Sequence, residues 1–102
     1  MDTTSLAVWL NIANILDLQT TFEGLKRGLK EANPIANYVL QTSGPQGLAT
    51  FKIAPILLLS TLAITNPTKH MEKLMHGLTV IFLLASINNI MMITLKEVLK
   101  HV

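Results

Sequence analysis

The sequence predicts an all-α integral membrane bundle of three transmembrane helices, with one short interfacial or re-entrant helix after Asn33-Pro34. Two observations lead to this fold class. Half of the 102 residues are hydrophobic and only 14% are charged, whereas soluble domains average roughly 25% charged residues. A chain this small also has too much surface to leave it so poorly charged in water. We therefore expect a single membrane domain, 1–102, with helices at about 5–26, 34–42, 45–65 and 72–99.

The first helix, at about 5–26, is predicted from a polar stripe. At 100° per residue, the stripe occupies about 80° of the helix surface and comprises Asn14, Asp17, Thr21, Gly24 and Gly28. In a soluble protein such a stripe would face water and would normally hold Lys and Glu. Amides, hydroxyls and glycines are instead what packs helix against helix in lipid. We therefore expect a membrane helix whose polar face points inward.

The short helix at about 34–42 is predicted from its start signal and its length. Pro34 fixes the backbone after Asn33, and the Asn33 side chain can cap a helix that begins there. The apolar run that follows is too short to cross a bilayer. We therefore expect it to lie at the interface or to re-enter the membrane.

The second spanning helix, at about 45–65, is bounded by two turn signals. Ser43-Gly44-Pro45 is typical of a helix start, and the Asn66-Pro67 pair is typical of a stop. The residues between these signals are mostly apolar, with Lys52 and Pro55 as interruptions. Pro55 would kink the helix, which membrane helices tolerate better than soluble ones do.

The third spanning helix, at about 72–99, is the clearest. From Leu74 to Leu95 the chain has 22 residues without Lys, Arg, Asp or Glu. At about 1.5 Å per residue, a helix of this length measures roughly 33 Å, enough to cross a hydrocarbon core of about 30 Å.

The basic residues predict the orientation of the bundle in the cell membrane. With the N-terminus outside and the C-terminus in the cytoplasm, five of the seven basic residues outside the helix interiors lie on the cytoplasmic side, which fits the positive-inside tendency. These five are Lys26, Arg27, Lys30, Lys96 and Lys100, while Lys69 and Lys73 fall outside.

This topology places the costliest polar groups of three helices at similar depths. Counted from the cytoplasmic helix ends at about 1.5 Å per residue, Asp17 lies roughly 13 Å deep, Lys52 roughly 10 Å, and Asn88 and Asn89 roughly 12 and 10 Å. An unpaired charge in mid-membrane costs about 2.5 to 3.5 kcal/mol. We therefore expect Asp17 to pair with Lys52, with Asn14 or Asn88 meeting their remaining hydrogen-bonding needs. Alternatively, Lys52 snorkels to the interface, Asp17 is protonated, or the layer only fixes helix register.

A wider pattern resembles a group of small prokaryotic multi-pass membrane proteins classed as a domain of unknown function. The pattern runs Asn14-x-x-Asp17-x-x-x-Thr21, Glu31-Ala32-Asn33-Pro34, Lys52 and Asn88-Asn89. The resemblance covers most of the chain and implies a three- or four-helix membrane domain, with no established activity. It also implies that Glu31 and Asn33 belong to the same site as Asp17; the alternative is a capped surface turn with a solvated Glu31. The candidate site residues are therefore Asn14, Asp17, Thr21, Glu31, Asn33, Lys52, Asn88 and Asn89.

Three functions are compatible with this layer. The first is a structural or accessory membrane subunit without enzymatic activity, held in the lipid bilayer as a homo-oligomer or within a larger complex. The second is an oligomeric pathway for protons, ions or small solutes that uses Asp17 and Lys52. The third is an intramembrane enzyme or ligand binder in which Asp17 and Glu31 act as an acid/base pair.

Other classes of function are not supported by the composition. The chain has no cysteine, and its net charge of +2 is too dispersed for nucleic-acid binding. No cofactor motif is present. His70 and His76 lie near Met71 and Met75, a combination that suits copper. Because the two histidines are not an i,i+4 pair, we expect no metal site.

Overall fold

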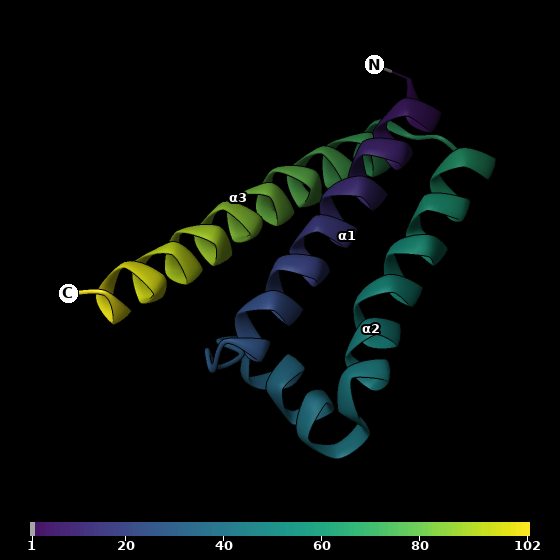
Figure 1. Ribbon diagram of the computed structural model, residues 1–102. Helices are drawn as coiled ribbons and strands as arrows, with labels where there is room; N and C mark the ends of the chain where they lie inside the picture. The colour runs from purple at the N-terminus through teal and green to yellow at the C-terminus, as the bar shows by residue number, and fades with distance from the viewer. Residues whose placement is uncertain (1) are drawn as a thin grey trace.

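The protein is built of three α-helices, and the computed structural model describes residues 2–102. The helices are α1 (Thr3–Lys26), α2 (Pro34–Thr65) and α3 (Lys69–Lys100), and the described residues contain no strand (Figure 1). α1 packs along both other helices, whereas α2 and α3 touch little. Figure 1 shows α2 and α3 meeting near the turn that joins them and then diverging, with α1 lying between them. The prediction of an all-α chain is therefore confirmed.

Each helix begins at a residue whose side chain caps it. The carboxylate of Asp2 accepts a hydrogen bond from Ser5 N at 2.7 Å, and this bond holds the pKa of Asp2 below its ordinary value. Asn33 accepts from two backbone amides of the first turn of α2, and Pro34 occupies the first helical position. Thr68 accepts from Met71 N at 3.1 Å. These caps satisfy amides that have no partner inside the helix.

The central part of the chain has two helical arms that meet at Gly44, close to the boundary between the helices predicted at 34–42 and 45–65. The structure contains a single bent element, α2, whose backbone leaves helical geometry only at Gly44, with φ 72° and ψ −172°. That conformation is accessible essentially to glycine alone. One residue is thus enough to redirect the chain, and no loop separates the two arms. The outer helices also begin earlier than the predicted 5 and 72, because Asp2 and Thr68 supply the caps.

Two helices, α2 and α3, are long and apolar enough to cross a membrane. α1 does not belong to this set, because the amides, hydroxyls and carboxylates along it lower its hydropathy. The prediction of three spanning helices plus a short one is therefore not matched by length and composition.

The interior has an apolar cluster on each side of a polar level of α1. One cluster joins Leu6, Ala7 and Leu10 of α1 to residues of α2 and α3, and the other contains Leu18, Ala36 and Leu48. Between these two clusters, the buried positions of α1 include Asn14 and Asp17. The polar side chains are therefore enclosed along the axis of the bundle rather than placed at its end.

Candidate functional site

α1 supplies the centre of a polar cluster inside the bundle. Asn14 is 1% exposed and Asp17 is also buried, while Thr21 is half-buried one turn beyond Asp17. The Thr21 hydroxyl donates to Asp17 Oδ1 at 3.5 Å. The spacing of these residues puts them on one face of a helix, and that face is turned toward α2 and α3.

α3 joins this cluster through Asn89. Its amide nitrogen Nδ2 lies 3.3 Å from Asp17 Oδ1, 2.9 Å from Thr20 Oγ1 and 3.1 Å from Thr21 Oγ1. An amide has only two N–H groups, so the three oxygens share two protons. Asn89 therefore links α3 to α1 by hydrogen bonds inside the bundle.

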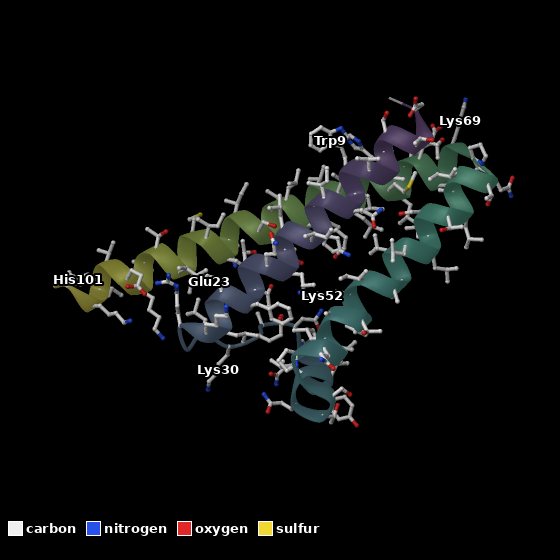
Figure 2. All side chains as sticks on the ribbon, turned by 45° about the vertical axis from the view of Figure 1, so that its right-hand side comes forward. Trp9, Glu23, Lys30, Lys52, Lys69 and His101 are labelled. Carbon is white, nitrogen blue, oxygen red and sulfur yellow. The ribbon has the colours of Figure 1, made fainter. Side chains whose placement is uncertain are left out.

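α2 contributes Lys52, which approaches the cluster from the other side. Lys52 Nζ lies 3.6 Å from Asp17 Oδ2, and the Lys52 backbone carbonyl accepts a hydrogen bond from Asn14 Nδ2 at 3.0 Å. Figure 2 shows the Lys52 side chain directed inward, between the helices. The pairing of Asp17 with Lys52 expected from their depths is thus present as a contact.

The turn after α1 brings in a second carboxylate, that of Glu31. α1 ends in a Schellman motif, in which Gly28 has φ 87° and Leu29 N donates to Gly24 O at 2.9 Å. This reversal folds Leu29 back over Gly24, whose missing side chain leaves room for it. Glu31 Oε2 then lies 4.0 Å from Lys52 Nζ, with its side chain only 9% exposed. The structure therefore places Glu31 against the cluster and not in solvent.

Asn33 and Asn88 occupy the margin of this arrangement. Asn33 N donates to Glu31 Oε1 at 3.1 Å, while the Asn33 side chain caps α2. Asn33 therefore positions Glu31 rather than contacting Asp17. Asn88 lines the adjoining space, and the described residues offer its side chain no hydrogen bond. We name the six remaining residues the polar cluster: Asn14, Asp17, Thr21, Glu31, Lys52 and Asn89.

The charged groups of the polar cluster lie farther from one another than hydrogen-bonded groups do, and they leave space between them. Both Lys52 contacts, at 3.6 and 4.0 Å, exceed the 2.7–3.2 Å of a normal hydrogen bond. Two buried acceptors, Asn14 Oδ1 and Glu31 Oε2, have no hydrogen-bond partner among the described residues. Two carboxylates and one ammonium also leave a formal charge of −1. Unpaired acceptors and uncompensated charge are costly in a buried site, so this arrangement is incomplete by itself.

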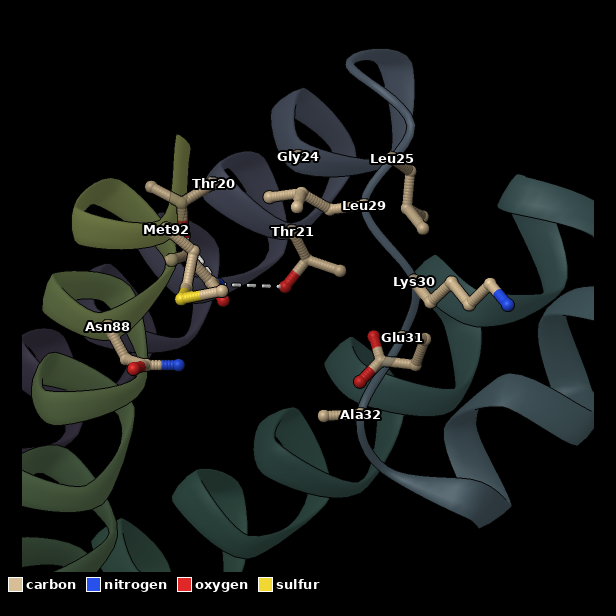
Figure 3. Close-up of a pocket in the computed structure, with 11 residues that line it drawn as sticks. Thr20, Thr21, Gly24, Leu25, Leu29, Lys30, Glu31, Ala32, Asn88 and Met92 are labelled. Carbon is tan, nitrogen blue, oxygen red and sulfur yellow. Dashed lines mark hydrogen bonds between the residues drawn. The ribbon is translucent and has the colours of Figure 1, made fainter. Parts of the chain in front are cut away.

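Two cavities meet at the polar cluster. The main cavity has a volume of about 510 Å³ and extends between α2 and α3, with α1 forming one wall. The side cavity, of about 260 Å³, lies under the α1–α2 turn. Figure 3 shows the Glu31 carboxylate directed into the side cavity and Lys30 directed away from it. The two cavities share Thr21, Glu31, Ala32, Asn88 and Asn89.

Several residues of the site were not predicted from the sequence. Thr20 accepts a hydrogen bond from Asn89, and its position three residues after Asp17 could have indicated this. Phe82 and Ala85 line the main cavity; they lie seven and four residues before Asn89, on the same helix face. The sequence alone therefore did not indicate that Phe82 and Ala85 line the cavity, because it did not show that the Asn89 face of the helix points inward.

The remaining charged and histidine side chains lie at the ends of the helices. Arg27 bonds Glu23 at 3.0 Å and Glu97 at 2.6 Å. The bond from Arg27 lowers the pKa of the Glu97 carboxyl, and the bond to Glu97 raises the pKa of Arg27. His70 and His76 are exposed near the start of α3, and residues 2–102 contain no group of three possible ligands for a metal ion.

Comparison with known proteins gives a family. Residues 8–95 match the family model described as "Domain of unknown function (DUF5658)". No curated protein and no solved structure gives a significant match. The matched range contains all six residues of the polar cluster together with Asn33 and Asn88.

Proposed function

The chain belongs to the family DUF5658, and we propose that it is an integral membrane protein whose three helices all cross the bilayer and enclose a binding site for a small ligand. The carrying observation is a cavity of about 510 Å³ that contains unpaired buried acceptors. Cavities of roughly 300–1,000 Å³ with a few convergent polar groups are the usual form of small-molecule sites.

The reversed polarity of α1 supports its membrane location. Its outward face is apolar and about half-exposed, and it consists of Val8, Trp9, Ile12, Ile15 and Leu16. Its inward face carries Asn14 and Asp17. A helix in water would bury the first set and expose the second, whereas a helix in lipid is expected to do the opposite. Low mean hydropathy in α1 therefore reflects its inner face and does not argue against spanning.

The distribution of charge along the bundle supports the same orientation. Figure 2 shows Trp9 and Lys69 near one end and Glu23, Lys30 and His101 toward the other. Figure 1 shows that α1 and α3 run in the same direction, so their basic C-terminal ends both lie away from the N-terminus, and α1 ends beside the bend of α2. These ends carry five basic residues and correspond to the cytoplasmic side. Trp9 is suited to the opposite interface.

The geometry favours binding over the other two functions. An accessory subunit needs an outer surface that binds a partner. That role gives no reason for the polar cluster to surround a cavity. A pathway for ions needs continuity across the bilayer, yet the apolar cluster around Leu10 and Met75 lies on the outer side of Asp17. An enzymatic role would require Asp17 and Glu31 to exchange a proton with a bound ligand. Lys52 lies between these two carboxylates, and this placement fits electrostatic binding of a ligand better than proton exchange.

Cysteine labelling tests the proposal, because the natural chain has no cysteine. Ala85→Cys places a thiol in the main cavity, and Leu84→Cys places one on the outer face of the same helix, where the side chain is 60% exposed. In vesicles we expect a small water-soluble thiosulfonate reagent to modify residue 85 and to spare residue 84. Thiolates are the reactive form and are disfavoured in hydrocarbon.

The opposite pattern would contradict the proposal. If residue 84 reacts as fast as residue 85, α3 lies in water and the chain does not span. If neither residue reacts while a cysteine at the exposed C-terminal Val102 does, the cavity is closed to polar molecules and binds no small polar ligand.

A further inference from the structure

We propose that the ligand is an organic ammonium ion with an apolar body, whose N–H groups bind Asn14, Asp17 and Glu31 while the apolar part lies between α2 and α3. This inference rests on the proposed binding function and names the chemistry of its ligand. It follows from three independent features of the site, namely its charge, its free acceptors and its walls.

The first feature is the charge balance. Asp17 and Glu31 face one ammonium group, that of Lys52, so with both carboxylates ionised the site carries one formal negative charge more than it neutralises. In a low-dielectric interior an uncompensated charge is expensive. A monovalent cation would remove this excess, whereas an anion would increase it. A neutral ligand would leave it unchanged.

The second feature is the type of atom left unpaired. Asn14 Oδ1 and Glu31 Oε2 are both acceptors, and both belong to side chains that are about nine-tenths buried or more. The amide of Asn14 is held in place because its nitrogen donates to the Lys52 carbonyl. Glu31 is held because its other oxygen accepts from Asn33 N. A ligand that satisfies these fixed acceptors has to bring N–H or O–H donors.

The third feature is the apolar wall. Phe51 and Ile56 of α2 and Ile81, Phe82 and Ala85 of α3 line the main cavity. Phe51 and Ile81 are about half-exposed, so they form a rim that a ligand in the bilayer can reach. Aromatic and aliphatic walls of this kind hold an alkyl or aryl group. The same chemistry occurs in free amines and in lipids with a primary amine headgroup.

Calorimetric titration of the full chain in phosphatidylcholine nanodiscs tests the proposal, because this lipid has no N–H donor. The probes are n-hexylammonium, hexan-1-ol, hexanoate and N,N,N-trimethylhexylammonium, all of similar length. We expect saturable binding of n-hexylammonium. The neutral, anionic and trimethylated probes should bind about tenfold more weakly or worse, as the loss of one charge-assisted hydrogen bond predicts.

Two variants of opposite charge change make the test specific. Glu31→Gln keeps the acceptor for Asn33 N and removes the excess charge, so we expect about a tenfold loss of n-hexylammonium affinity. Lys52→Met removes the competing ammonium and should increase the affinity. Glu23→Gln is the matched control, because Glu23 is an exposed glutamate on the same helix end and lies outside both cavities. This variant should bind like the natural chain.

The lipid source is resolved by repeating the titration in discs that contain phosphatidylethanolamine. If the natural ligand is a lipid amine, apparent affinity for n-hexylammonium falls in these discs, whereas a free amine leaves it unchanged. Either result supports an ammonium site. Equal binding of hexanoate or hexan-1-ol, or no saturable binding of n-hexylammonium, overturns the inference. The binding function itself is tested separately by the thiosulfonate reagent, and it fails if residue 85 is also closed to that reagent.

Discussion

At the scale of single residues, the charges of the polar cluster depend on one another. Among residues 2–102, Lys52 is the only basic group within 4.0 Å of the carboxylates of Asp17 and Glu31, at 3.6 and 4.0 Å. Removing one carboxylate leaves a neutral pair, whereas removing Lys52 leaves two like charges in a buried site. Loss of Lys52 is therefore expected to have a larger effect than loss of either carboxylate. The pairing of Asp17 with Lys52 predicted from the sequence does not contain this difference.

We expect Lys52→Met to destabilise the bundle more than Asp17→Asn does. Breaking a buried pair costs about 3–5 kcal/mol when it leaves a charge uncompensated, and Asp17→Asn leaves Lys52 with Glu31. The double variant should recover part of the loss, with a coupling of about 0.5–3 kcal/mol. Thermal or denaturant unfolding in detergent micelles measures all four proteins. Additive losses would contradict the ion pair.

Adjacent asparagines on α3 provide a matched pair for a second prediction. Asn89→Leu removes the hydrogen bonds that tie α3 to α1, and we expect a loss of about 1–3 kcal/mol because Asp17 and two hydroxyls lose a donor. Asn88→Leu changes only a cavity wall and should cost little. The same unfolding measurement compares them. Equal losses would mean that Asn89 acts through packing and not through its amide.

The sequence could predict the contact of Asp17 with Lys52, because depth along a spanning helix follows from residue counting alone. It could not predict the free Asn14 Oδ1, which depends on where the nitrogen of the same amide finds an acceptor. Only the family resemblance indicated that Glu31 belongs to the site, because the position of Glu31 depends on the direction that the chain takes in the turn at Gly28. The functional role of these residues stays a prediction.

At the scale of elements, the reversal after α1 decides whether Glu31 reaches the site. We expect Gly28→Ala to destabilise the protein by about 1 kcal/mol, because φ of 87° disfavours any residue with a Cβ. The Lys96 amine that a Cβ would approach is at the end of a flexible side chain and can move. Glu31 should be displaced, so amine binding should weaken as well.

Gly77→Ala is the control for this substitution. Gly77 lies within α3, and nothing stands within 4 Å of an added Cβ. Alanine there should leave stability unchanged or raise it by up to about 1 kcal/mol. Thermal unfolding compares the two variants. A Gly28→Ala protein as stable as Gly77→Ala would show that the reversal does not depend on glycine.

The C-terminal ends of α1 and α3 are joined by an ion pair that responds to pH. Because Arg27 lowers the pKa of Glu97 below its unfolded value of about 4.5, the pair contributes stability above that value and loses it as pH falls through the folded pKa. We expect the midpoint of thermal unfolding to drop on acidification below about pH 4.5. Glu97→Gln should remove this component, and high salt should reduce it. A pH profile unchanged by Glu97→Gln would contradict the pair.

The bend of α2 lies where the sequence signals place a boundary between two helices. Asn33-Pro34 and Gly44-Pro45 are both valid start signals, and each marks the beginning of an arm of α2. The signals did not give the backbone conformation at Gly44, where a single residue with positive φ joins the two arms without a loop. Caps and apolar runs were therefore enough to predict the two helical arms. Whether the arms form one continuous element depends on the backbone conformation of Gly44 alone.

At the scale of the whole molecule, the distribution of polarity is the inverse of that in a water-soluble bundle. Large apolar side chains cover the outside of all three helices, while amides, hydroxyls and charges meet inside. α2 and α3 satisfy a length and hydropathy criterion for spanning and α1 does not. The location of Asp17 therefore separates two possible arrangements. If α1 crosses, the polar cluster lies within the bilayer; if it does not, the cluster lies at a surface.

The most direct measurement is the sidedness of Thr4→Cys, compared with single cysteines at Gln41, Lys69 and Val102 in a chain that otherwise has none. A membrane-impermeant maleimide is applied to intact cells and to inverted vesicles. We predict that residues 4 and 69 react from outside and that residues 41 and 102 react from the cytoplasmic side. If residue 4 reacts on the same side as residue 41, only two helices cross and the proposed intramembrane site does not exist.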